Sequence, residues 1–183
     1  MNHWKKPAVI LACAILAVLP CANAMAAQPS EYEVKAAFIH NIAKFVEWPA
    51  SAPSSGSARL CLLGQNPFGN ALDALQGKQI GGLRWEIVPA DPGTNLRECR
   101  VLFIAASEKG NLGGILKNIG NSPVLTIGDS GGYAGQGVMV NFYLEENRVR
   151  FEINRDAAKR AGLGIGSQLL KLARLVREDR GAP

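Results

Sequence analysis

A serine flanked by glycines and preceded by an aspartate is the feature of this sequence that comes nearest to an enzyme motif. Residues 128–132 read Gly-Asp-Ser-Gly-Gly, which copies the segment around the nucleophile of chymotrypsin-like proteases. That chemistry requires a histidine base held by a buried aspartate. His40 is the only histidine beyond the N-terminal segment, and it lies in a predicted helix rather than in a loop of a β-barrel. We therefore interpret residues 128–132 as a glycine-rich turn and expect no hydrolase activity.

Two further glycine-rich segments resemble nucleotide-binding loops only in part. Residues 64–69 follow a predicted strand, but Asn70 and Ala71 stand where a phosphate loop needs lysine followed by serine or threonine. Residues 162–166 begin a predicted helix without a strand directly before them. The histidines and acidic residues also lack the spacing of a metal site. We therefore expect a protein that is not an enzyme and that binds no cofactor or metal.

The first 26 residues have the pattern of a secretory signal peptide. Lysines at 5–6 precede an apolar run at 8–19, and small residues at 22–26 provide a cleavage site. Pro20 ends the apolar run well short of the roughly 20 residues that a membrane-spanning helix needs. We predict cleavage after Ala26, export to the periplasm, no integral membrane segment in the mature chain and no nucleic-acid partner.

Residues 27–183 are predicted to form a single α/β domain. The whole sequence is 48% apolar and 19% charged, which excludes a disordered, collagen-like or coiled-coil protein. Only Cys61 and Cys99 remain after cleavage, in a compartment that oxidises thiols. Their spacing is not that of a CxxC metal or redox pair. We therefore predict a Cys61–Cys99 disulfide.

Apolar patterns along the mature chain predict helices that alternate with strands. The helices show an amphipathic stripe, and the strands are unbroken apolar runs, typical of strands covered on both faces. The expected helices lie at 31–46, 68–75 and 112–119, and the expected strands at 60–63, 85–88, 101–104 and 124–127. This alternation predicts an α/β fold of three layers, in which helices cover both faces of a mostly parallel central sheet.

The pattern changes in the last third of the chain. Apolar and polar residues alternate at 138–144 and again at 149–153, which predicts an antiparallel C-terminal hairpin. A short helix is expected over 156–161, and an apolar stripe over 165–176 predicts a final helix. A hairpin at the edge of a sheet needs protection from other strands, so we also expect a homodimer.

Charge is distributed unevenly along the mature chain. Residues 148–180 contain nine Lys and Arg against four Asp and Glu, whereas residues 27–147 contain nine against eleven. The C-terminal segment is therefore basic. It is either a solvated helix face, or a docking surface for an acidic partner or for an anionic membrane.

Five segments spread over residues 32–176 together resemble the YfiR-like family of periplasmic proteins. They occur in the order and at the spacing of that family, although His40 stands where the family usually has tyrosine. The segments read VKAAFIHNIAKFVEWP (34–49), VLTIGD (124–129), VNFYL (140–144), VRFEIN (149–154) and SQLLKLA (167–173).

The resemblance implies a regulator without catalytic activity. A YfiR-like repressor binds the periplasmic part of an inner-membrane diguanylate cyclase and restrains it, which lowers cyclic di-GMP in the cell. Release of the cyclase would need a signal that lowers this affinity: a thiol reductant acting on Cys61–Cys99, an outer-membrane lipoprotein that competes for the repressor, or a small ligand, and the sequence does not choose among them. Cys61 and Cys99 match the family's pairing of a cysteine on the first strand with one ahead of the third, but a second bridge of the family, near the hairpin, has no cysteines here.

The family's partner contacts correspond to the end of the hairpin and the helix that follows it. The resemblance places them here at Arg150, Phe151, Glu152, Asn154 and Asp156. Glu152 is the leading candidate for a partner contact. The alternative is a surface carboxylate that pairs with Arg148 or Arg150 and has no part in binding.

A periplasmic sensor of small ligands, acting on another membrane signalling protein, is the alternative function. Ligands of open α/β sheets bind beyond the carboxyl ends of the parallel strands. Gly64, Gly128 and Asp129 are expected to meet at that edge, near Ala105 and Ala106. A cleft filled by the protein's own loops would exclude this function.

Overall fold

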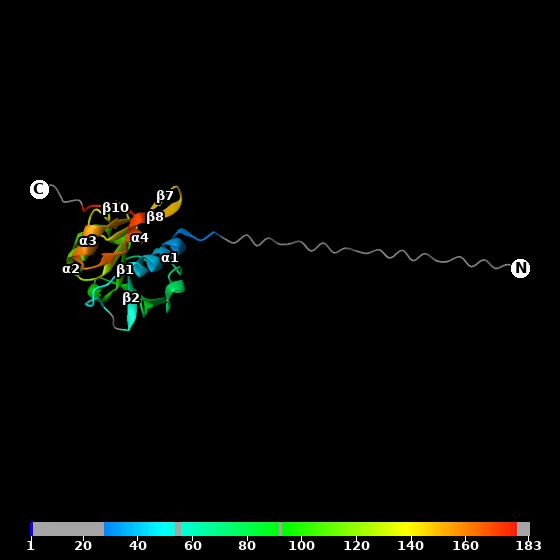
Figure 1. Cartoon of the computed structure of the whole chain (residues 1–183), viewed down its shortest axis with the longest axis horizontal. Coiled ribbons are helices and arrows are strands. Elements are labelled where there is room, and N and C mark those ends of the chain that lie inside the picture. The colour runs from blue at the N-terminus through cyan, green and yellow to red at the C-terminus, as the bar shows by residue number, and fades with distance from the viewer. Residues whose placement is uncertain (2–27, 54–55, 92, 179–183) are drawn as a thin grey trace.

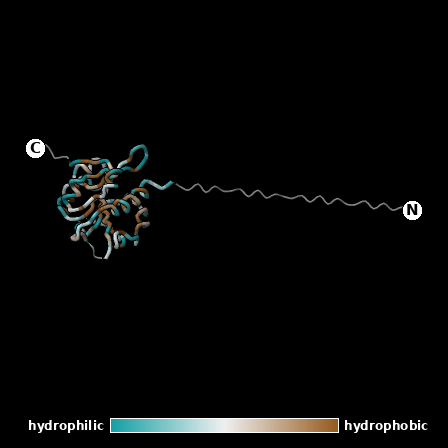
Figure 2. The backbone as a smooth tube through the Cα atoms, viewed as in Figure 1, coloured by the Kyte–Doolittle hydropathy of each residue, from teal (hydrophilic) through white to brown (hydrophobic). Residues whose placement is uncertain are grey.

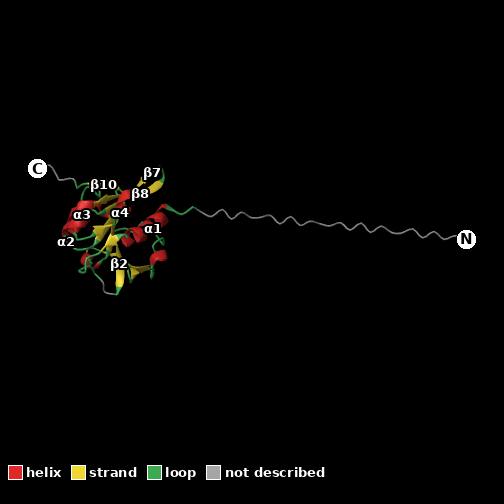
Figure 3. Ribbon diagram, viewed as in Figure 1, coloured by secondary structure: helices red, strands yellow, loops and turns green. Residues whose placement is uncertain are grey.

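The structure is a computed structural model that describes residues 1, 28–53, 56–91 and 93–178. Apart from Met1, the predicted signal peptide therefore lies outside the described residues, and its cleavage stays a prediction. An eight-stranded sheet runs through the domain in the order β10-β8-β7-β6-β5-β2-β4-β3. Figure 3 shows these strands crossing the interior, with the helices around them. The predicted α/β architecture is confirmed.

The centre of the sheet is parallel. β2 (Ser57–Leu63) lies between β4 (Leu83–Ala90) and β5 (Val101–Ile104), and β6 (Leu125–Gly128) follows β5 on the other side. Alternate residues of β2 belong to different cores, with Leu60 and Leu62 on one side of the sheet and Cys61 and Leu63 on the other. Both faces of these strands are covered, and this explains why their sequences are unbroken apolar runs.

Different helices cover the two faces of the sheet. α1 (Glu31–Lys44) packs on the larger core, and a capping box between Ser30 and Glu33 sets where this helix begins. The short helix η3 (Ala106–Asn111) and α2 (Leu112–Ile119) lie on the opposite face, where α2 buries Leu112, Ile115 and Ile119. Helices thus lie on both sides of the sheet, as predicted.

The predicted hairpin is formed by β7 (Val140–Glu145) and β8 (Arg148–Asn154). Glu146 and Asn147 connect them with positive φ angles of 49° and 58°. Two consecutive residues of positive φ suit the twist of a two-residue hairpin turn. The tip of the hairpin projects from the body of the domain in Figure 1 and is mostly hydrophilic in Figure 2.

The final long helix predicted over 165–176 is wrong. After α3 (Arg155–Arg160), the chain forms β9 (Gly164–Ile165), α4 (Ser167–Leu172) and β10 (Arg174–Val176). β9 pairs with β1 (Val46–Glu47), and β10 lies parallel to β8. The helical pattern does not continue because Arg174–Val176 pair with β8 instead, and Arg174 forms an ion pair with Glu152 across the sheet. β10 also shields part of the hairpin edge from which the homodimer was expected.

Two elements between β2 and β5 also differ from the prediction. Only Asp73–Leu75 form a short helix (η1) in place of the helix expected over 68–75. Asn66 accepts a hydrogen bond from the Phe68 amide and donates one to Gly69, so side-chain bonds hold this stretch in turns. β4 continues through Pro89 to Ala90, since the short β3 (Gln79–Ile80) pairs only with the beginning of β4.

The predicted disulfide is confirmed. Cys61 of β2 and Cys99, which follows the short helix η2 (Leu96–Glu98), are bonded across 5.8 Å between their Cα atoms. Both are almost fully buried in the core beneath α2. The bond therefore ties the middle of β2 to the residues that lead into β5.

Candidate functional site

The five residues expected to contact a partner lie together, but only two of them reach the solvent. Arg150 and Asp156 are exposed. Phe151, Glu152 and Asn154 are buried, so they lie behind the surface that a partner could touch. Their contact with a partner stays a prediction, and the structure gives each of the three a role within the domain.

Glu152 is the centre of a row of polar side chains that crosses the sheet. Its Oε1 accepts a hydrogen bond from Asn141 (3.0 Å), and its Oε2 accepts two from the Arg174 guanidinium (2.6 and 3.1 Å). Glu152 therefore pairs with Arg174 rather than with Arg148 or Arg150. The hydrogen bonds that Arg174 donates to the Glu152 carboxylate raise the pKa of Arg174. The carboxylate joins β10 to the hairpin, a role that sequence reasoning missed.

Asn154 and Phe151 fix the base of the hairpin. The Asn154 side chain accepts a hydrogen bond from the Ala157 amide (2.9 Å), which caps α3, and donates one to the Ala134 carbonyl (2.7 Å). The Phe151 ring packs edge-on against Phe38 of α1, with 5.9 Å between centroids. Both residues hold the surrounding surface in place.

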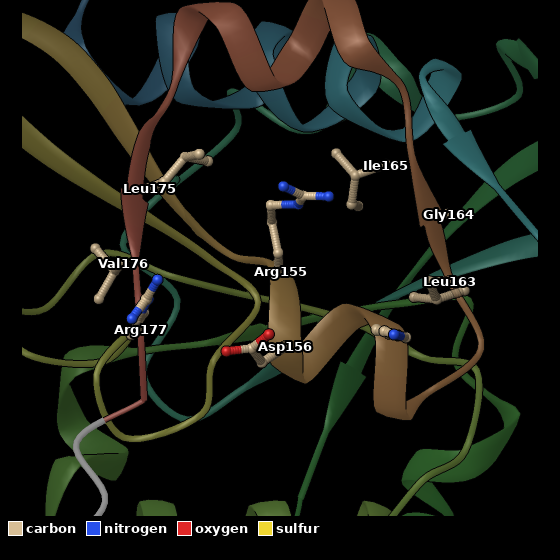
Figure 4. Close-up of a pocket in the computed structure, with 9 residues that line it drawn as sticks. Arg155, Asp156, Leu163, Gly164, Ile165, Leu175, Val176 and Arg177 are labelled. Atoms are coloured by element: carbon tan, nitrogen blue, oxygen red, sulfur yellow. The ribbon is translucent and has the colours of Figure 1, made fainter.

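A pocket of about 590 Å³ lies next to this base, enclosed by α3, β9 and β10. In Figure 4, β9 and β10 form opposite walls, and the Arg155 side chain rises between Ile165 and Leu175. The lining combines apolar side chains with charged groups, and the charged groups are mostly cationic. The lining residues are Arg155, Asp156, Lys159, Leu163, Gly164, Ile165, Leu175, Val176 and Arg177.

Exposed apolar side chains lie on or beside the elements around this pocket, with the exception of Leu144 near the hairpin tip. Among the described residues beyond Met1, four large apolar side chains are exposed, namely Phe45, Leu144, Leu172 and Leu175. Leu172 and Leu175 lie at the end of α4 and in β10, with exposed fractions of 75% and 52%. The Phe45 carbonyl accepts a hydrogen bond from Gly166, directly before α4. Clustered exposure of this kind marks surfaces that bind other proteins.

The carboxyl edge of the parallel strands does bring Gly64, Gly128 and Asp129 together, but the domain's own side chains fill it. A Cβ atom on Gly64 would overlap the Ser107 hydroxyl, and one on Gly128 would overlap the Tyr133 ring. The Tyr133 hydroxyl donates a hydrogen bond to the Ala105 carbonyl (3.1 Å). The geometry therefore favours a closed edge over a ligand cleft.

The carboxylate of Asp129 is bonded to neighbouring side chains at that edge. Its carboxylate accepts hydrogen bonds from Lys35 (2.9 Å) and Tyr32 (3.1 Å), and Lys35 also pairs with Glu31. Burial alone would lower the pKa of Lys35, but its bonds to Glu31 and Asp129 outweigh this effect and raise it. Asp129 thus anchors α1 to the sheet. The spacing of Glu31 and Lys35 by one helical turn could have predicted their own ion pair, but it carries no information about Asp129.

His40 is engaged elsewhere. Its Nδ1 accepts a hydrogen bond from the Trp85 indole (2.8 Å), which joins α1 to β4. Burial, followed by the nearby charges of Lys44 and Lys78, lowers the pKa of His40. His40 and Asp129 therefore have separate structural partners. The described residues contain neither a cluster of side chains suited to a metal ion nor a helix long and apolar enough to cross a membrane.

The fold and this surface define an α/β domain whose accessible apolar and basic groups suit protein binding. The chain matches the YfiR/HmsC-like family over residues 32–174 and belongs to that family. Members of the YfiR-like family are periplasmic regulators in cyclic di-GMP signalling, and they are not enzymes.

A solved structure from Vibrio cholerae O1 biovar eltor str. N16961, described as a conserved domain protein, is similar to this chain. It has a TM-score of 0.54 and 11% sequence identity, over 81% of this chain and 60% of the other. At that identity the likeness shows the fold alone. This chain thus spans 60% of the length of the Vibrio protein.

Proposed function

We propose that this protein is exported to the periplasm, where it binds and restrains the periplasmic part of an inner-membrane diguanylate cyclase. The single observation that carries the proposal is the pocket between α3, β9 and β10, with exposed Leu172 and Leu175 beside it. Exposed leucines next to such a pocket are costly to leave in water unless a partner covers them. Family membership supports the regulatory role.

Restraint across a membrane requires differential affinity. The domain must bind the inactive conformation of the cyclase more tightly than the active one, because equal affinity would shift no equilibrium. A tenfold preference corresponds to about 1.4 kcal/mol. An outer-membrane lipoprotein that covers the same surface would release the cyclase by competition.

Two exposed leucines provide the test. Leu175 lines the pocket, whereas Leu144 lies near the hairpin tip, and their exposed fractions are similar at 52% and 51%. Each variant, Leu175→Glu and Leu144→Glu, is co-expressed with a membrane diguanylate cyclase from the same genome, and cellular cyclic di-GMP is measured. We expect wild type and Leu144→Glu to lower cyclic di-GMP, and Leu175→Glu to fail. A folded Leu175→Glu variant that restrains the cyclase fully would refute the proposal that this surface binds the cyclase.

A small-ligand sensor is the competing proposal. Its cleft would lie at Gly64, Gly128 and Asp129, where a ligand would have to displace side chains already packed there. We therefore favour the protein-binding function. A thermal-shift screen of the mature protein with amino acids and nucleotides tests the alternative. We expect no shift, and a stabilisation that is lost in Asp129→Asn would favour the sensor.

A further inference from the structure

The hairpin buries one face and exposes the other. Phe142 and Phe151 lie opposite each other across its two strands and are buried beneath α1. Because side chains alternate along a strand, their neighbours point to the other side of the sheet. We call the accessible residues on that side the basic face: Tyr143, Glu145, Arg148 and Arg150, with Arg174 of β10.

The layer that covers the rest of this side does not reach the basic face. On β5 and β6, side chains on the same side, such as Leu102 and Ile104, are buried beneath α2 and Tyr133. On the basic face, the side chains of Arg150 and Arg174 are 49% and 56% exposed. This part of the sheet is therefore open to a partner.

Arg174 is held in place before any partner arrives. Its Nε and Nη2 groups both donate to Glu152, and its guanidinium lies 4.1 Å from the centroid of the Tyr143 ring. Among the described residues, Nη1 of Arg174 has no hydrogen-bond partner. A guanidinium fixed in this way loses little side-chain entropy when it binds a carboxylate.

The cations of the basic face follow the period of a strand. Arg148 and Arg150 are two residues apart on β8, and Arg174 lies opposite Glu152, two residues further along. Every second residue of a strand advances by about 7 Å. Glu145 is the acidic member of the face, and its 3.6 Å contact with Arg150 joins two half-exposed side chains and is weak.

The backbone beside these arginines has a free edge. β8 pairs with β7 along its whole length, but with β10 only from Glu152 to Asn154. Within the described residues, no strand pairs with the outer side of residues 148–151. Such an edge can accept an additional extended segment.

We infer, on the basis of the proposed function, that the basic face receives an extended acidic segment of the partner. Carboxylates at alternate positions of that segment would meet Arg148 and Arg150, and its end would face Arg174, because β10 continues along the same edge from Glu152 onward. The partner chemistry is therefore an acidic peptide in strand conformation, on the side of β10 opposite to Leu175.

A synthetic peptide tests the inference without the cyclase. The probe is an acetylated ten-residue peptide of alternating threonine and glutamate, and the matched peptide has glutamine in place of glutamate. Affinity is measured by fluorescence anisotropy at low salt with the mature protein. We expect the acidic peptide to bind at least tenfold more tightly than the glutamine peptide, and to weaken as salt screens the charges.

Variants with the same change in net charge locate the binding. Arg148→Gln with Arg150→Gln is expected to weaken the acidic peptide at least tenfold. Lys109→Gln with Lys117→Gln, on exposed positions of η3 and α2, is expected to change the affinity less than twofold. Arg174→Lys keeps the charge but loses the two-donor contact with Glu152. We expect it to weaken the acidic peptide more than the lysine double variant does and less than the Arg148 and Arg150 double variant does. Thermal denaturation of each variant checks that the domain remains folded.

Three outcomes would overturn the inference. These are equal affinity for both peptides, equal losses in the two double variants, or binding only to anionic phospholipid vesicles with the same arginine dependence. A failed peptide test together with intact restraint of the cyclase would leave the proposed function standing. Peptide binding by a protein that restrains no cyclase would instead count against the proposed function.

Discussion

The carboxyl edge of the parallel strands and the C-terminal surface use their polar groups in opposite ways. At the carboxyl edge, Asp129 is bonded to Lys35 and Tyr32, and Tyr133 fills the space over Gly128. At the C-terminal surface, Arg155 stands in an open pocket and Leu175 is exposed. The edge where α/β sheets commonly bind ligands here supports the fold, and the binding surface that we propose lies at the segment after the hairpin.

The largest expected effect concerns the Cys61–Cys99 disulfide, which lies in the core beneath α2. Replacing Cys61 and Cys99 with alanine opens a loop of 38 residues, and the chain-entropy relation gives a loss of about 4 kcal/mol. We expect this loss in urea denaturation of the double variant relative to the oxidised protein. If the folded fraction still binds the partner with wild-type affinity, binding at the C-terminal surface does not depend on the disulfide. A stability equal to that of wild type would contradict the prediction.

The second effect concerns the buried ion pair between Lys35 and Asp129. Asp129→Ala leaves Lys35 with Glu31 as its one remaining anionic partner, and the side chains of Lys35 and Asp129 are only 4% and 5% exposed. Losing one partner of such a pair destabilises the fold by about 3 kcal/mol. Denaturant unfolding measures this effect, and Asp73→Ala provides a control. Unchanged stability of Asp129→Ala would contradict the anchoring role of this ion pair.

The third effect is smaller and lies at the boundary of the two regions. Glu152→Gln keeps an acceptor for Asn141 but loses the charge that holds Arg174. Because Arg174 is more than half exposed, we expect a loss of about 1 kcal/mol in unfolding free energy. Affinity for the partner should fall as well, since β10 and Arg174 become less well fixed. Unchanged affinity would mean that Glu152 acts on stability alone.

The smallest effect is a dependence on pH. The pKa of His40 lies below its ordinary value of about 6.5, so the unfolded chain takes up a proton at a higher pH than the folded one. The contribution of His40 to stability is therefore complete above about pH 6.5 and is lost as pH falls through its lowered pKa. We expect His40→Phe to flatten this part of the stability profile measured by urea denaturation. A slope that persists in His40→Phe would place its origin in another group.

The sequence predicted the parts of the fold that local pattern decides. The strands at 101–104 and the helix at 112–119 have the predicted bounds because each has one dominant apolar period. β10 was missed because Leu172 and Val176 continue a helical stripe, whereas the strand depends on Arg174 meeting Glu152 from a distant part of the chain. Local periodicity carries no information about such a contact.

The sequence pattern did not reveal the contacts of the residues that we expected to bind a partner. Asp156 lines the pocket, but Glu152 is buried and paired with β10, a strand that the pattern did not predict. The partners of Asp129 were also hidden, since Lys35 lies 94 residues away in the chain. In contrast, the disulfide followed from counting cysteines once export was assumed.

The position of β10 in the chain has a consequence for incomplete molecules. β10 is formed by Arg174–Val176, close to the end of the chain, and it supplies one wall of the pocket as well as one arginine of the basic face. A fragment cut by a protease before residue 174 would keep both cysteines and the doubly covered strands. It would lose one wall of the pocket and Arg174, so we expect proteolysis at this place to remove the proposed binding surface.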